Sequence, residues 1–99
     1  MKITILLFDG FTALDVIGPY EVLVRIPDAK VIFTGLEKKV YSDPYGLKIN
    51  AEYSISEIIE SDILLIPGGS GIDRIVQNIE IIKWIKAIDK TTKFTVSVC

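Results

Sequence analysis

Short apolar runs recur along the chain and predict the strands of a buried sheet. Ile3–Phe8, Asp62–Pro67 and Phe94–Cys99 are almost continuous in apolar residues, and Lys30–Thr34 is a shorter run of the same kind. Strands that are buried on both faces show such runs, whereas strands with one face in water alternate apolar and polar residues. The four runs therefore predict four strands of a parallel sheet.

Two longer segments space their apolar residues as amphipathic helices do. The first extends from Ala13 to Val24 and contains Gly18-Pro19, where we expect a kink because proline lacks the amide hydrogen that a helix interior needs. The second begins at Ile72, and Gln77-Asn78 is a candidate break within it. We expect the stripe of the second segment to face the core; its members are Ile72, Ile75, Val76, Ile79, Ile82 and Ile85.

Two smaller features lie between the second and third strands. Alternating segments within Val40–Asn50 flank Asp43-Pro44-Tyr45-Gly46, whose proline and glycine are turn residues, and this predicts a β-hairpin excursion at the sheet edge. Ser54-Ile55-Ser56-Glu57 matches a capping box, which predicts a short helix over Ser54–Glu60.

The alternation of strands and helices predicts an α/β fold in which helices sandwich a doubly wound parallel sheet. The sequence stops inside its last apolar strand, and no helix follows to cover it. We therefore expect residues 1–99 to be the N-terminal half of a single larger domain, or to be covered by another copy of the chain.

Composition excludes several classes of function. The chain has 99 residues, a net charge of −2 with both signs interspersed, one Cys and no His. It has no basic stripe for nucleic acid and no apolar run of the ~18 residues that span a membrane. A single Cys forms no internal disulfide, which fits a reducing, cytoplasmic location. Metal sites built from His or from several thiolates are excluded by count.

Cys99 is the first candidate for chemistry. It ends the last strand, and in open α/β sheets ligands bind at the carboxyl ends of the strands. A nucleophile at a turn from strand to helix is aimed into that crevice. A buried, inert thiol is an equally good interpretation of the position alone, because free Cys is among the most buried residue types.

Two further segments belong to the same predicted edge. Pro67-Gly68-Gly69-Ser70-Gly71 follows a strand, and its glycines offer amide groups for an anion or oxyanion, although a tight turn explains them as well. Asp15 is a candidate proton donor and acceptor, although Thr12-x-x-Asp15 also fits a capping box. Of the competing carboxylates, Asp9 is interpreted as a turn residue and Glu21 as a charge on a helix face.

Three segments together resemble the ThiJ/PfpI superfamily, in its isonitrile hydratase branch. They are Leu6–Leu23 (LLFDGFTALDVIGPYEVL), Ile66–Gly71 (IPGGSG) and Val96–Cys99 (VSVC), and their order and spacing agree along all 99 residues. The resemblance implies a flavodoxin-like fold, a homodimer, a small-molecule substrate and no metal or organic cofactor. It also implies Cys99 as the nucleophile, Asp15 as the carboxylate beside it, and the amides of Gly68 and Gly69 as the pocket lining.

The function that this resemblance implies is hydration of an isonitrile to an N-substituted formamide. Two other classes share these segments. One is the ligand-sensing domain of AraC-type transcription regulators, and the other is a cysteine-dependent redox or carbonyl-stress protein of glyoxalase or peptidase type. The PfpI-type peptidases carry a His directly after the Cys, and the hydratases carry a Thr in that region, which lies beyond residue 99.

Overall fold

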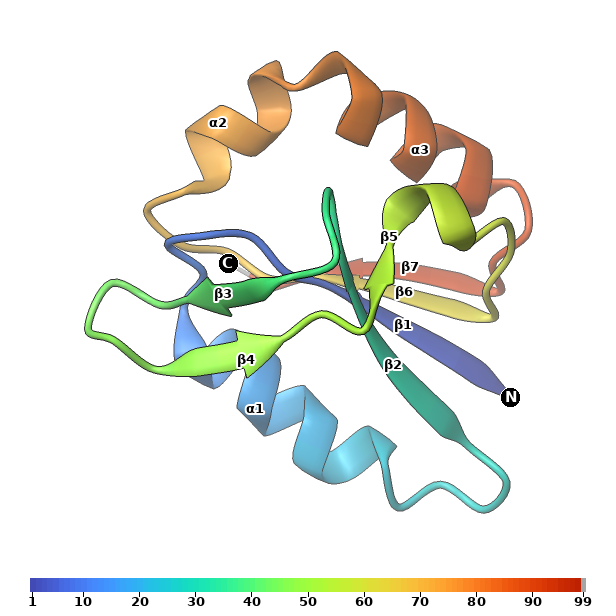
Figure 1. The fold of residues 1–99 in the computed structure, drawn as a ribbon. Helices are drawn as coiled ribbons and strands as arrows, with labels where there is room; N and C mark the ends of the chain where they lie inside the picture. The colour runs from blue at the N-terminus through green and yellow to red at the C-terminus, as the bar shows by residue number, and fades with distance from the viewer. Residues whose placement is uncertain (99) are drawn as a thin grey trace.

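The computed structural model describes residues 1–98, and its centre is a five-stranded sheet in the order β5-β2-β1-β6-β7 (Figure 1). All four pairs of neighbouring strands are parallel. The α/β fold with a parallel sheet between helices is therefore confirmed. The strands are β1 Lys2–Leu6, β2 Lys30–Gly35, β5 Tyr53–Ser54, β6 Ile63–Ile66 and β7 Phe94–Ser97.

The sheet centre is β1, whose apolar sequence suits a strand with both faces covered. Ile3, Ile5 and Leu6 are fully buried. The polar side chain of Thr4 is also buried, and its hydroxyl donates a hydrogen bond of 2.8 Å to Ser61 Oγ, which prevents the cost of an unpaired buried group.

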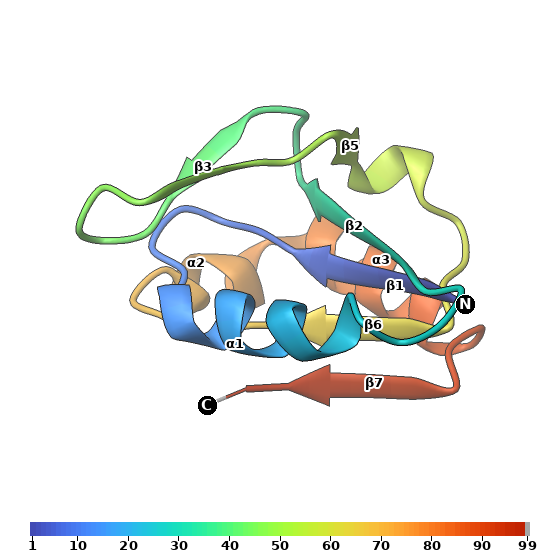
Figure 2. The ribbon, with the colours of Figure 1, turned by 90° about the horizontal axis from the view of Figure 1, so that it is seen from below.

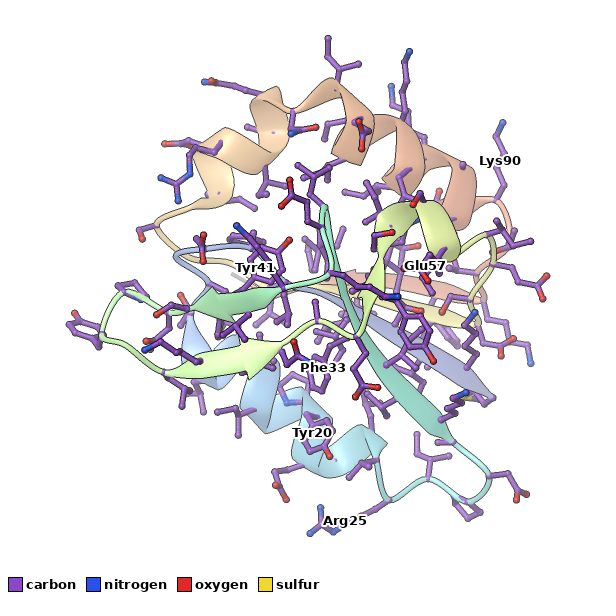
Figure 3. All side chains as sticks on the ribbon, in the orientation of Figure 1. Tyr20, Arg25, Phe33, Tyr41, Glu57 and Lys90 are labelled. Carbon is purple, nitrogen blue, oxygen red and sulfur yellow. The ribbon has the colours of Figure 1, made fainter. Side chains whose placement is uncertain are left out.

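Helices cover the two faces of the sheet (Figures 1 and 2). On one face lies α1 (Ala13–Leu23), which continues through Pro19. Val16 is its fully buried contact, and the ring of Tyr20 packs 5.5 Å from that of Phe33 on β2 (Figure 3). On the other face lie α2 (Ile72–Gln77) and α3 (Ile79–Asp89). No helix within residues 1–98 has the length and apolar character that a membrane crossing requires.

The break predicted at Gln77-Asn78 is present, and it changes which isoleucines enter the core. Asn78 caps α3, because its side-chain oxygen accepts a hydrogen bond of 3.0 Å from the Ile81 amide. The new helix starts in a different phase, so Ile81 becomes buried and Ile79 is 71% exposed. Val76, near the end of α2, is 59% exposed. The prediction that these last two residues face the core was wrong.

The excursion and the short helix differ in how well they match expectation. The hairpin is confirmed as a separate antiparallel pair, β3 (Val40–Ser42) with β4 (Lys48–Asn50), closed by Asp43, whose carboxylate accepts from the Tyr45 and Leu47 amides. The expected helix is a single 3-10 turn, η1 (Ile55–Glu57), because β5 and the return into β6 occupy the flanking residues.

The last strand, β7, forms as predicted but is not buried by residues 1–98. All four of its residues are exposed, including Phe94 at 64% and Val96 at 41%. Figure 2 shows β7 at the edge of the sheet. Between this strand and α1 runs an open apolar groove of about 550 Å³, lined by Gly18, Pro19, Val22, Leu23, Ile63, Leu65, Phe94, Val96 and Val98.

Candidate functional site

The loop after β1 and the loop after β6 meet at the carboxyl edge of the sheet. The chain leaves β1 for β2 on one side and leaves β6 for β7 on the other, so the two central strands flank the topological switch point. In open α/β sheets this is where ligands bind. The loops are joined by a bridge between Phe11 and Gly69 and by a hydrogen bond of 2.9 Å from the Thr12 amide to the Gly68 carbonyl.

Asp15 lies at this meeting point, in the first turn of α1. The residue is only 8% exposed, and its Oδ2 accepts a hydrogen bond of 3.2 Å from the Gly68 amide. The side chain of Thr12 makes no capping hydrogen bond, so the capping box that the sequence also allowed is not formed. The structure thus brings together two of the predicted site residues, and the carboxylate faces the glycine turn instead of its own helix end.

The glycine turn needs glycine for a steric reason at Gly69. This residue has φ of +141°, a conformation that L side chains rarely adopt, and a Cβ placed on it would overlap the carbonyl oxygen of Gly10. The Gly68 amide is already used by Asp15. Gly68 therefore orients the carboxylate, and its amide is not free to receive an oxyanion while that hydrogen bond is kept.

The predicted nucleophile, Cys99, lies outside the described residues. The strand that leads to it stays in register with β6 as far as Ser97, which pairs with Ile66, and the Val98 amide donates a hydrogen bond of 3.1 Å to the Ile66 carbonyl. Up to Val98, therefore, the chain runs beside the strand that ends in Pro67-Gly68-Gly69.

The competing carboxylates are placed as their sequence positions suggested. Asp9 lies in the turn after β1, where its carboxylate accepts from the Ser42 amide at 3.1 Å and so ties the turn to the hairpin. Glu21, on the exposed side of α1, pairs at 2.9 Å with Arg25, which follows the helix and is labelled in Figure 3. Within residues 1–98, no three side chains of the metal-binding types gather closely enough to hold an ion.

A second pocket, which the sequence patterns did not predict, is a cavity of about 380 Å³ between the β2–β3 connection and α2. Its walls come from four segments that are separate in sequence, so no local pattern of residues predicts it. Tyr41 fixes one wall, because its hydroxyl donates to the Glu37 carbonyl and accepts from the Glu37 amide, both at 2.9 Å (Figure 3). Burial raises the pKa of Tyr41, although the backbone hydrogen bond opposes this.

Comparison with known proteins assigns the chain to a family. The sequence profile of the DJ-1/PfpI family matches residues 1–99, the whole chain. The chain belongs to the DJ-1/PfpI family. Because that family is the ThiJ/PfpI superfamily of the sequence resemblance, the resemblance is confirmed at this level.

Individual relatives agree with the assignment. This DJ-1/PfpI chain is 25% identical to an isonitrile hydratase of Pseudomonas putida over 99 residues, which are 100% of the chain and 43% of that relative. Its fold matches a ThiJ/PfpI family protein of Pseudomonas syringae with a TM-score of 0.94 at 22% identity, over 99% of this chain and 41% of the other. Drosophila melanogaster DJ-1beta gives a TM-score of 0.86 at 18% identity, over 99% and 54%.

These coverages mean that the chain spans less than half the length of the Pseudomonas proteins that it matches. The structural matches are below 25% identity, so they establish the shared fold. The similarity to the isonitrile hydratase is weak, and it is the one among these comparisons that names a reaction.

Proposed function

We propose that residues 1–99 are the N-terminal half of one cysteine-dependent domain that hydrates isonitriles to N-substituted formamides. The observation that carries the proposal is the buried Asp15 carboxylate, held by the Gly68 amide at 3.2 Å at the carboxyl edge of the sheet. Strand β7, which pairs with β6, leads to Cys99. The family contains cysteine-dependent enzymes, and the 25% identity to an isonitrile hydratase gives the reaction class.

The first step forms a covalent bond to sulfur. The thiolate of Cys99 attacks the terminal carbon of R–N≡C, while Asp15 in its protonated form transfers its proton to the same carbon. One S–C and one C–H bond form, one C–N π bond is lost, and the product is the thioimidate R–N=CH–S–Cys99. Asp15 is left as the carboxylate.

The second step uses water and restores both residues. The Asp15 carboxylate removes a proton from water as the oxygen attacks the thioimidate carbon, and that proton passes to nitrogen. The resulting R–NH–CH(OH)–S–Cys99 collapses: the C–S bond breaks, the hydroxyl proton returns to Asp15, and R–NH–CHO leaves. The sum is addition of one water molecule, with no oxidant or reductant and no need for a His.

The glycine turn supports this role by positioning the acid. The Gly68 amide binds Oδ2 of Asp15, which leaves Oδ1 as the oxygen that carries the travelling proton. Burial of Asp15 beside the turn shields the carboxyl group from bulk solvent, so the one water molecule it must reach is the one that attacks the thioimidate. We propose Gly69 as the pocket wall, the complete protein as a cytoplasmic homodimer, and no bound cofactor in the reaction.

Isotope labelling tests the chemistry directly. The full-length protein is incubated with phenyl isonitrile in D₂O and, separately, in ¹⁸O-labelled water, and the N-phenylformamide is analysed by mass spectrometry. We expect one deuterium on the formyl carbon and one ¹⁸O in the carbonyl. Cys99→Ala should abolish turnover, whereas Ser97→Ala, a matched truncation on the exposed strand β7, should retain it.

Two outcomes would contradict the proposal. Full activity of Cys99→Ala would remove the covalent step. A folded protein that converts neither alkyl nor aryl isonitriles would remove the reaction class. In the latter case, consumption of glyoxal would indicate the carbonyl-stress alternative, and a DNA-binding segment after residue 99 would indicate the regulator.

A further inference from the structure

The cavity between the β2–β3 connection and α2 lies outside the proposed hydratase chemistry. Its volume of about 380 Å³ is in the range of small-molecule sites. It shares two loops with the candidate site, because Asp9 and Gly71 belong to its lining. Asp15, Gly68 and Gly69 do not.

The floor of this cavity is apolar and well packed. Leu7, Phe8, Ile75 and Ile81 line it, and each is less than 8% exposed. They come from the β1 end, from α2 and from α3, so three buried elements fix the shape of the floor. A ligand that fits can therefore place an apolar part on this floor and a polar part at the rim.

The rim of the cavity is charged, and its charges are not equally satisfied. Lys39 pairs with Asp9 at 3.8 Å. Arg74 donates one hydrogen bond of 3.0 Å to the backbone carbonyl of Asp9, and it takes part in none of the ion pairs formed among residues 1–98. Most of the five N–H donors of the Arg74 guanidinium therefore remain available to hydrogen-bond a negatively charged ligand.

We propose that this cavity binds a small molecule that carries one carboxylate on an apolar body. The carboxylate pairs with Arg74, and the apolar body packs against the apolar floor. The planar guanidinium matches a carboxylate in geometry and pairs with it through two parallel hydrogen bonds. A dianion such as a phosphate monoester is disfavoured, because Lys39 is already paired with Asp9, which leaves Arg74 as the cation for the ligand, and Glu37 adds a negative charge to the lining.

The test uses 4-phenylbutyrate, the uncharged 4-phenyl-1-butanol, 4-phenylbutylamine and phenyl phosphate, titrated into the full-length protein with ¹³C-labelled isoleucine methyl groups. Ile75 and Ile81 report on the cavity, and Ile63 reports on the apolar groove beside β7. We expect saturable shifts of the first two with 4-phenylbutyrate, and binding weaker by about tenfold or more for the other three probes, because each lacks the single-charge match.

Variants at the chain's two arginines complete the test. Arg74→Gln should weaken 4-phenylbutyrate about tenfold and leave 4-phenyl-1-butanol unchanged, and Arg74→Lys should fall between, because it keeps the charge and loses the fork. Arg25→Gln, the same change in the turn after α1 and outside the cavity, should have no effect. Equal binding of acid and alcohol, retained affinity in Arg74→Gln, or shifts confined to Ile63 would each overturn the proposal, as would the absence of shifts.

Discussion

Replacing Asp15 by asparagine tests the proposed proton transfer with the least change of shape. Asp15 is 8% exposed and touches the glycine turn through one hydrogen bond from the Gly68 amide at 3.2 Å. The side-chain amide oxygen of the introduced asparagine can accept that same hydrogen bond. The substitution therefore keeps the contact between the two loops and removes the proton that the mechanism moves.

The expected effects on stability and on turnover differ in size. The proposed mechanism starts from protonated Asp15, so both the acid and the introduced asparagine accept a neutral hydrogen bond, which contributes about 0.5–1.5 kcal/mol, and the variant should lose about 1 kcal/mol of stability at most. For a complete domain of this family that is a fall of a few degrees in Tm. Loss of general acid–base catalysis costs about 10²-fold or more in turnover, or ~2.7 kcal/mol of barrier.

The assay measures Tm by calorimetry and turnover of phenyl isonitrile in the same full-length preparations. Asp73→Asn is the matched control, because Asp73 is an exposed carboxylate in the first turn of α2. It should change neither quantity by much. If Asp15→Asn kept near-normal turnover while Tm fell, Asp15 would be a structural link between the loops, and the proposed mechanism would lose its acid and base.

Three other perturbations have outcomes that the geometry determines. Gly69→Ala should destabilise the protein by about 3 kcal/mol or more, because the new Cβ combines a positive φ with overlap on the Gly10 carbonyl oxygen. Gly46→Ala, at φ +103° in open space, should cost about 1 kcal/mol, and denaturant titration of the two variants would contradict the steric argument if it gave the opposite ranking. Burial raises the pKa of Tyr41 above 10.0 in the folded state, so the stability that the neutral phenol contributes is complete below pH about 10 and is lost as the pH rises through the raised pKa. The free energy of unfolding of Tyr41→Phe should therefore fall less steeply with pH in that alkaline range than that of the unsubstituted protein, and equal slopes would contradict the burial argument. A sample of residues 1–99 should bind 8-anilinonaphthalene-1-sulfonate in its apolar groove and enhance the fluorescence of the dye. Val96→Lys should reduce this fluorescence more than Thr95→Lys, because Val96 lines the groove and Thr95 does not, and equal reductions would show that the dye binds elsewhere.

Sequence patterns predicted the elements whose signal is local. The apolar runs of β1, β6 and β7 and the turn chemistry at Asp43 each determine their own segment. They did not predict β5, because its two residues form a strand only by pairing with Thr34 and Gly35, which are distant in sequence. Ile79 was placed in the core because a single helical phase was extended through Asn78, where a cap restarts the helix, whereas Val76 lies before that cap, near the end of the short helix α2.

The candidate site shows the same division between local and long-range information. The sequence pointed to Asp15 and to the glycine turn, but the neighbours of Asp15 alone favoured a capping box with Thr12, and the site role came from the family resemblance. The hydrogen bond to Gly68, which no local pattern could predict because it spans 53 positions, shows where the carboxylate lies, and its role in catalysis stays a prediction. Arg74 was not predicted as a binding residue, because its hydrogen bond to the Asp9 carbonyl joins residues that are 65 positions apart in sequence.

The central place of β1 has a consequence for synthesis on the ribosome. β1 is made before β2 and β6, and it pairs with residues 30–34 on one side and with residues 63–65 on the other. One edge of an apolar strand therefore stays open until β6 has left the exit tunnel. Unpaired apolar edges are what aggregation and chaperones act on. The pace of translation between β2 and β6 thus sets how long a nascent chain presents that edge, and rare codons within that stretch would lengthen the exposure.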